Sequence, residues 1–124
     1  MLIKIANFTE KELRCPCCGL FNMTDRHLIN LQALRYRLGL PLTVTSGCRC
    51  MKHNRTVGGV PNSRHQASTK QADATDVTCE NMVELFHVAR KIGLFKEVIL
   101  YKEQNFLHLA TYPDKKFIYF DVVM

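Results

Sequence analysis

A long polar stretch near the middle of the chain, Gly47–Gln71, most constrains the fold. It is rich in Gly, Pro, Asn, Ser and Arg and shows little apolar periodicity, so it predicts a loop. The flanking segments, Leu42–Ser46 and Ala74–Thr78, are short and rich in β-branched residues, which indicates strands. A loop this long in a compact domain is usually functional or disordered, and its position between two strands favours function. We therefore expect functional residues in and around this loop.

Helices are expected before and after these strands in the sequence. A leucine repeat at helical spacing predicts a helix from Thr24 or Asp25 to Leu38. The run Asn81–Ile92 predicts a second long helix, and a capping-box pattern at Thr9–Glu12 predicts a short one near the N-terminus. The stripe of leucines is interpreted as core.

The C-terminal part is typical of a β-meander. We expect strands at Glu97–Tyr101, Phe106–Ala110 and Phe117–Val122, joined by turns at Lys102–Asn105 and Tyr112–Lys116. The whole chain, residues 1–124, is then one α+β domain, with two main helices packed on a small, mostly antiparallel sheet. A chain of 124 residues is long enough to bury such a core.

Charge and hydropathy limit the partners. The formal net charge of +6 favours an anionic partner such as nucleic acid or a bacterial cell-wall polymer, or it serves solubility. The basic residues form no stripe interleaved with stacking aromatics, so no nucleic-acid partner is expected. No apolar run is long enough to span a membrane, and the N-terminus is too polar for a secretory signal. The chain is expected to be cytoplasmic as synthesised.

The chain has six cysteines, which is many for a cytoplasmic protein. They are grouped as Cys15, Cys17 and Cys18, then Cys48 and Cys50, then Cys79 alone. In a reducing compartment such groups are more often metal ligands than disulfides. Three readings stay open: a structural zinc bound by the first group and Cys50, small buried side chains, and disulfides formed after release.

Three residues of the second half have the composition of a catalytic zinc site. His65 lies in the polar loop, and Asp76 and His108 lie in strand-like runs. Two imidazoles and one carboxylate leave a fourth tetrahedral position for water, which distinguishes a catalytic zinc from a structural one. Spacing alone leaves open whether the three side chains meet.

An ordered set of motifs resembles the M15 family of zinc peptidases. The motifs are Ser46-Gly47-Cys48-Arg49, Ser63-Arg64-His65, Ala72-Asp73-Ala74-Thr75-Asp76 and Leu107-His108-Leu109. The resemblance covers roughly Phe8 to Thr111. It implies a Hedgehog/DD-peptidase-like fold with Zn²⁺ bound by His65, Asp76 and His108. Cys48 and Ala72 depart from the family pattern, which has tyrosine and glycine there.

The resemblance also implies roles beside the metal. Arg49 suits capture of a peptide carboxylate or carbonyl, and Ser63 suits orientation of His65 or contact with substrate. Many members have a carboxylate three residues before the second histidine, but this chain has Asn105, which cannot act as a base. Glu103 is therefore the predicted catalytic base, and Glu97 is the other carboxylate expected nearby.

The predicted function is zinc-dependent cleavage of peptidoglycan stem peptides. The enzyme would be a D-Ala-D-Ala carboxypeptidase or an endopeptidase of the phage or prophage endolysin type. A peptidoglycan peptide is the expected partner, the protein is expected to be a monomer, and it would act at the bacterial cell wall after release. The alternative is a weak or inactive zinc-binding module that binds the cell wall. A cysteine-rich zinc module that binds nucleic acid is a third hypothesis.

Overall fold

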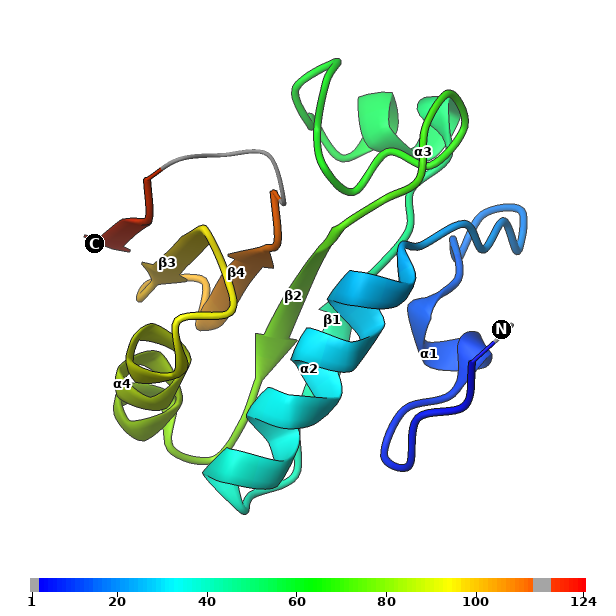
Figure 1. Cartoon of the computed structure of the whole chain (residues 1–124). Helices are drawn as coiled ribbons and strands as arrows, with labels where there is room; N and C mark the ends of the chain where they lie inside the picture. The colour runs from blue at the N-terminus through cyan, green and yellow to red at the C-terminus, as the bar shows by residue number, and fades with distance from the viewer. Residues whose placement is uncertain (1–2, 113–116) are drawn as a thin grey trace.

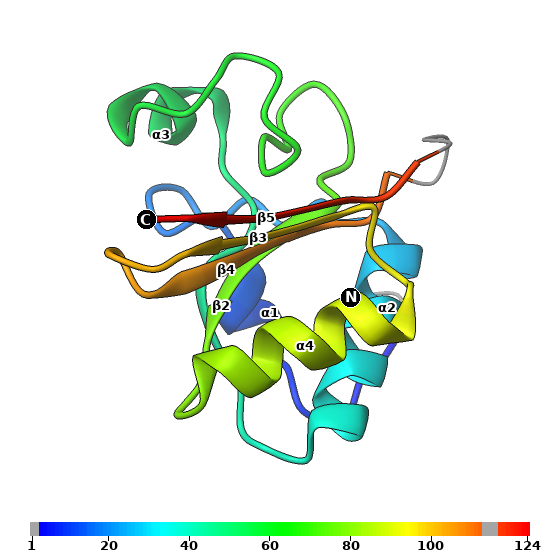
Figure 2. The same ribbon diagram turned by 90° about the vertical axis from the view of Figure 1, so that its left-hand side faces the viewer.

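The computed structural model describes residues 3–112 and 117–124, which form a five-stranded sheet covered by helices (Figure 1). Two long helices, α2 and α4, pack on one face of this sheet, and the segment with α3 lies on the other side (Figure 2). The elements are α1 (Glu10–Leu13), α2 (Asp25–Leu38), β1 (Thr43–Ser46), α3 (Met51–Thr56), β2 (Ala74–Thr78), α4 (Met82–Ile92), β3 (Glu97–Tyr101), β4 (Phe106–Ala110) and β5 (Tyr119–Val123). The predicted α+β class is confirmed. Among the described residues, no helix has the length and apolar character needed to cross a bilayer.

Local sequence signals set the helix ends. In α1, the Thr9 side chain accepts a hydrogen bond from the backbone N–H of Glu12, and the Glu12 carboxylate accepts one from the Thr9 N–H. In α2, Thr24 accepts from the N–H of His27, and Gly39 ends the helix in the left-handed region at φ 72°. The predicted capping box and long helix are confirmed.

The strand order is β1-β2-β4-β3-β5, and one pair of neighbours, β3 and β5, is parallel. The expected C-terminal meander is therefore wrong in its last step. The two edges of β4 are already paired with β2 and β3, so the last strand adds to the remaining edge of β3. This strand covers Tyr119–Val123 instead of the expected Phe117–Val122. The predicted turn before it includes residues 113–116, which lie outside the described residues.

The register of the sheet decides which side chains share a face. Asp76 of β2 lies opposite His108 of β4, and His108 lies opposite Ile99 of β3. Side chains alternate along a strand, so Asp76 and His108 point away from α2 and α4. Their neighbours Val77 and Leu107 point toward the helices and are fully buried in the core.

One polar side chain is buried between α2 and the sheet. His27 has no exposed surface, and its two ring nitrogens lie 2.7 Å from Thr111 Oγ1 and 3.0 Å from Thr75 Oγ1. Burial disfavours the charged ring and lowers the pKa of His27 to about 3. The histidine is therefore a neutral bridge between the helix and the sheet.

The sequence predicts that residues 47–71 are a loop throughout, but the structure has a short helix within this segment. This helix is α3, whose N-cap is Cys50, with the thiol accepting from the N–H of His53 at 3.3 Å. Arg49 and Gln66 form an isolated parallel bridge, which folds the segment back beside the end of β1. A helix of six residues is too short to produce an amphipathic repeat, so the sequence pattern did not reveal it.

Candidate metal centre

The three residues expected to share a metal meet on the face of the sheet opposite α2 and α4. His65 comes from the segment between α3 and β2, Asp76 from the middle of β2, and His108 from the middle of β4. One ligand atom from each lies within 4.8 Å of the other two. Two imidazoles and a carboxylate at this spacing fit Zn²⁺ with one coordination position left for water or substrate.

The orientation of His65 is set by the backbone of Gly47. The Nδ1 atom lies 2.9 Å from the Gly47 carbonyl oxygen, so Nδ1 is the donor in the neutral ring. The Nε2 atom then carries the lone pair, and it lies 3.2 Å from Asp76 Oδ1. A cation between these two electron-rich atoms would stabilise the arrangement, which is the chemistry of a metal site.

His108 is held between two carboxylates. Its Nδ1 lies 3.1 Å from Asp76 Oδ1, and its Nε2 lies 3.3 Å from Glu97 Oε1. Glu97 begins β3 and contacts the ring from the side opposite Asp76. A carboxylate on the outer nitrogen of a metal-binding histidine fixes the ring and increases its basicity. Glu97 is thus placed to position His108 and leaves Nδ1 as its ligand atom.

The electrostatics of the centre follow from these contacts. Burial alone would raise the pKa of Asp76, but the hydrogen bonds from His108 and His65 outweigh burial and hold this pKa well below its usual range. Burial alone would lower the pKa of His108, but Asp76 and Glu97 raise it to about 9. The two carboxylates therefore stabilise positive charge on the ring between them.

Arg49 borders the centre and is fixed by three side chains. Its Nε donates to Ser46 Oγ at 3.0 Å, Nη1 to Asn54 Oδ1 at 3.4 Å, and Nη2 to Asp76 Oδ2 at 3.4 Å. Burial lowers the pKa of Arg49 and Asp76 opposes that effect, but a guanidinium stays charged at neutral pH. Arg49 therefore presents a fixed positive charge beside the candidate ligands.

A pocket of about 530 Å³ opens over the three ligands. Ser63 lines it and accepts a hydrogen bond from the backbone N–H of His65 at 3.2 Å. Glu103 is exposed in the turn between β3 and β4 and does not line this pocket. Among the described residues that do line it, Asp76 is the one carboxylate. The structure thus brings Arg49 and Ser63 to the ligands and leaves Glu103 outside.

Part of the pocket wall was not predicted from the sequence. Tyr101, Gln104 and Phe106 line it from the β3–β4 hairpin, and the rings of Tyr101 and Phe106 stack with centroids 4.7 Å apart. The predicted hairpin contained the signal, because its four-residue turn pairs Tyr101 with Phe106. Strand alternation then places both rings on the face of His108.

A two-histidine, one-aspartate group under an open pocket is typical of metal-dependent hydrolases. The chain belongs to the Peptidase M15 family, because the model of that family matches residues 6–110. The protein is therefore a peptidase, and the family predicted from the sequence motifs is confirmed. The matched region includes His65, Asp76 and His108. A comparison with curated proteins gave no match.

Proposed function

We propose that the protein is a zinc-dependent metallopeptidase that cleaves the stem peptides of peptidoglycan, as a D-Ala-D-Ala carboxypeptidase or an endolysin-type endopeptidase. The observation that carries this proposal is the convergence of His65, Asp76 and His108 beneath one pocket. Membership of a peptidase family supports a peptide substrate. The donor set supports zinc, because it offers three protein ligands and one open position.

His65 Nε2, Asp76 Oδ1 and His108 Nδ1 are the atoms that would hold the ion. When bound, Zn²⁺ would polarise the scissile carbonyl and make a water molecule more acidic. Arg49 is proposed to bind a carboxylate or carbonyl of the substrate, because its charge is fixed at the edge of the pocket. Ser63 is proposed to hold the His65 backbone or to contact the substrate directly.

The proposed general base is Glu103, which would take a proton from the attacking water. It lies in the same turn as Gln104, which lines the pocket. Glu97 contacts His108 and is assigned a positioning role instead. The assignment of Glu103 stays a prediction and is tested by substitution below.

The proposed substrate agrees with the charge of the protein. Peptidoglycan carries anionic groups, and the chain has a formal net charge of +6. The open pocket, with the stacked pair Tyr101 and Phe106 on its wall, can accept an extended peptide. The proposed place of action is the bacterial cell wall, which the protein would reach after release from the cytoplasm, and the proposed working unit is a monomer.

Digestion of purified murein tests the proposal. The zinc-loaded protein is expected to release peptide fragments or D-Ala, detected by mass spectrometry, and a chelator should abolish the release. Asp76→Ala should lose both the activity and the zinc of this centre. His87→Ala, which alters an exposed histidine on α4, is the matched control and should retain both. Activity and zinc content that survive Asp76→Ala would contradict the proposal.

A second candidate is a zinc-binding module that binds the cell wall without cleaving it. It is favoured by Asn105 at the usual position of the base and by the lack of a second carboxylate among the described residues that line the pocket. This candidate predicts co-sedimentation of the protein with murein and an unchanged murein digest at every zinc concentration. Any metal-dependent turnover would exclude it.

A further inference from the structure

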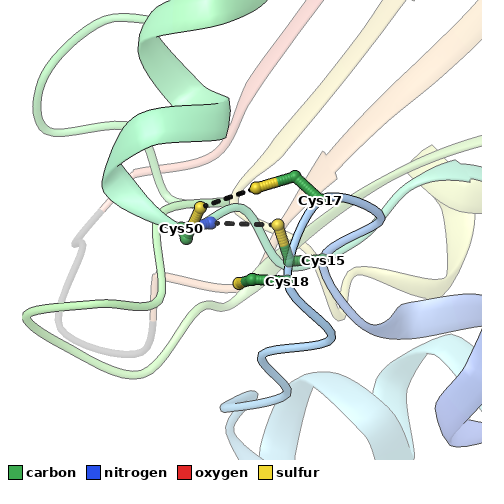
Figure 3. Close-up of side chains that lie close together, drawn as sticks. All are labelled: Cys15, Cys17, Cys18 and Cys50. Atoms are coloured by element: carbon green, nitrogen blue, oxygen red, sulfur yellow. Dashed lines mark hydrogen bonds between the residues drawn. The ribbon is translucent and has the colours of Figure 1, made fainter.

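Four cysteine side chains gather where the N-terminal segment meets α3 (Figure 3). Cys15, Cys17 and Cys18 come from the loop after α1, and Cys50 is the N-cap of α3. The four sulfur atoms all lie within 4.8 Å of one another. We propose that these cysteines form a second metal site, a closed tetrathiolate for Zn²⁺ or a similar thiophilic divalent cation.

The spacing of the sulfur atoms fits a tetrahedral ion. A zinc–sulfur bond of about 2.3 Å corresponds to a sulfur–sulfur edge of about 3.8 Å. Cys17 Sγ and Cys50 Sγ are 3.4 Å apart, and the remaining pairs lie within the 4.8 Å limit. A disulfide needs about 2.05 Å, and all six cysteines are free thiols. Small adjustments of the side chains would therefore complete a metal site.

The backbone of the loop after α1 brings Cys15, Cys17 and Cys18 together. Within the loop, the N–H of Gly19 donates to the Cys15 carbonyl, and the N–H of Cys15 donates to the Leu20 carbonyl, both at 2.8 Å. Gly19 has φ 78°, in the left-handed region, and so lets the chain turn back sharply. This turn directs thiols that are close in sequence toward one point.

Backbone donors also point at the sulfur atoms. The N–H of Cys50 lies 3.4 Å from Cys15 Sγ, and the N–H of His53 lies 3.3 Å from Cys50 Sγ. Such donors stabilise negative charge on sulfur, as the outer partners of metal ligands do. A divalent cation would replace the protons that the thiols otherwise share.

Ordinary packing does not explain the group. Cys15 is buried, but Cys17 and Cys18 are exposed, so they do not serve as small core residues. The buried Cys48 lies outside the group, as does Cys79. Four protein ligands leave no open coordination position, so the proposed role is structural and not catalytic.

The proposed site would act on the metal centre through a short segment. Cys50 directly follows Arg49, and the same segment contains Gly47, whose carbonyl orients His65. The N–H of Cys48 donates to the Leu13 carbonyl at 2.8 Å, which ties this segment to the end of α1. An ion held by both chain segments would fix the position of Arg49 and of the Gly47 carbonyl.

Counting zinc per chain tests the proposal. The purified protein is expected to hold two zinc ions, and the double variant Cys17→Ser, Cys18→Ser is expected to hold one. Asp76→Ala should also hold one, because it removes the other site. Cys79→Ser is the matched control and should hold two. One zinc in the unaltered protein, absent from Asp76→Ala, would overturn the proposal without affecting the proposed peptidase function.

Cobalt substitution gives a second readout that needs no variant of the cysteines. Co²⁺ added to the zinc-free protein should produce thiolate-to-cobalt absorption in the near ultraviolet. The His–Asp–His centre has no thiolate, so Asp76→Ala should retain this band. Absence of the band at saturating Co²⁺ would overturn the proposal, and so would a Cys17–Cys50 disulfide in protein kept under reducing conditions.

Discussion

His108 lies between Asp76 and Glu97, and these two carboxylates affect its ring in different ways. Asp76 shares the inner side, where a metal would bind, and Glu97 contacts the outer nitrogen. Removal of Glu97 would leave all three ligands in place but would loosen the ring and make it less basic. Positioning and ligation can therefore be separated by substituting one residue.

Glu97→Gln is expected to weaken zinc binding about 10- to 100-fold, the usual effect of losing the outer partner of a histidine ligand. The affinity should be measured by competition with a chromophoric chelator above pH 9, where His108 is neutral in both proteins. At saturating zinc most of the activity should return. An unchanged affinity would contradict the positioning role.

Glu103→Gln is expected to give the opposite result. If Glu103 is the general base, kcat should fall about 10²- to 10⁴-fold with zinc affinity unchanged, because Glu103 is not one of the three ligands. Murein hydrolysis and zinc competition on the same preparation measure both quantities. Full activity in this variant would exclude Glu103 as the base.

The raised pKa of His108 also predicts how zinc binding depends on pH. The metal needs a neutral ring, but in the metal-free protein the ring stays protonated up to a pKa of about 9. The apparent affinity should therefore rise about tenfold per pH unit from this proton alone, and this contribution should level off near pH 9. Chelator competition at several pH values measures the slope. An affinity that is flat below pH 9 would contradict the prediction.

At the scale of helices and strands, the elements with clear periodicity were predictable. The leucine repeat of α2 and the hairpin of β3 and β4 were found with nearly correct ends. The short helix α3 was missed, because six residues carry no repeat. The pairing of β5 with β3 was also missed, because the sequence pattern does not indicate which edge of the sheet is free.

The contact of α2 with the sheet predicts sensitivity to acid. His27 has a pKa of about 3 in the folded protein and about 6.5 when unfolded, so the unfolded chain binds more protons between these values. Stability should be full above pH 6.5 and should fall as the pH decreases toward 3. The loss from this group is about 2 kcal/mol at about pH 5.

Urea unfolding of the zinc-loaded protein at pH 7 and pH 5 measures this loss. His27→Gln keeps a neutral polar side chain and should remove this part of the pH dependence, although its stability at pH 7 will be lower. His87→Gln, on the exposed face of α4, should leave the pH dependence as it is. An equal loss in the protein and in His27→Gln would contradict the assignment.

As with the helices and strands, part of the candidate site was predictable from the sequence and part was not. His65, Asp76 and His108 could be proposed because their motifs occur in a recognisable order, although they are far apart in sequence. The contact between Glu97 and Nε2 of His108 could not be predicted, because Glu97 lies diagonally opposite His108 on the neighbouring strand. The grouping of Cys50 with the N-terminal cysteines was one of three readings that the sequence left open, because it depends on a tertiary contact that spacing does not encode.

At the scale of the whole molecule, Gly47 joins the N-terminal segment to the metal centre. A Cβ at this position would collide with the backbone of Leu13, so the close approach requires glycine. The carbonyl of Gly47 accepts from His65. A displacement here would therefore affect the packing of α1 and the orientation of a metal ligand together.

Gly47→Ala is expected to lower the free energy of unfolding by about 1–3 kcal/mol, through overpacking, and to weaken zinc binding. Urea unfolding and chelator competition measure the two effects. Gly93→Ala is the matched control. It strains a left-handed residue after α4, at φ 68° with open space around it, and should reduce stability without changing zinc affinity. Unchanged zinc binding in Gly47→Ala would contradict the coupling.

Side chains alternate along β4, so the length of this strand cannot change by one residue without disrupting the metal centre. Adding or removing one residue within this strand would replace His108 at the centre with a leucine and place the histidine in the core. Residues 68–71 lie outside the strands and are largely exposed. Changes of length in a lineage should therefore accumulate there, and a loop inserted at that point would leave the strand register of the centre unchanged.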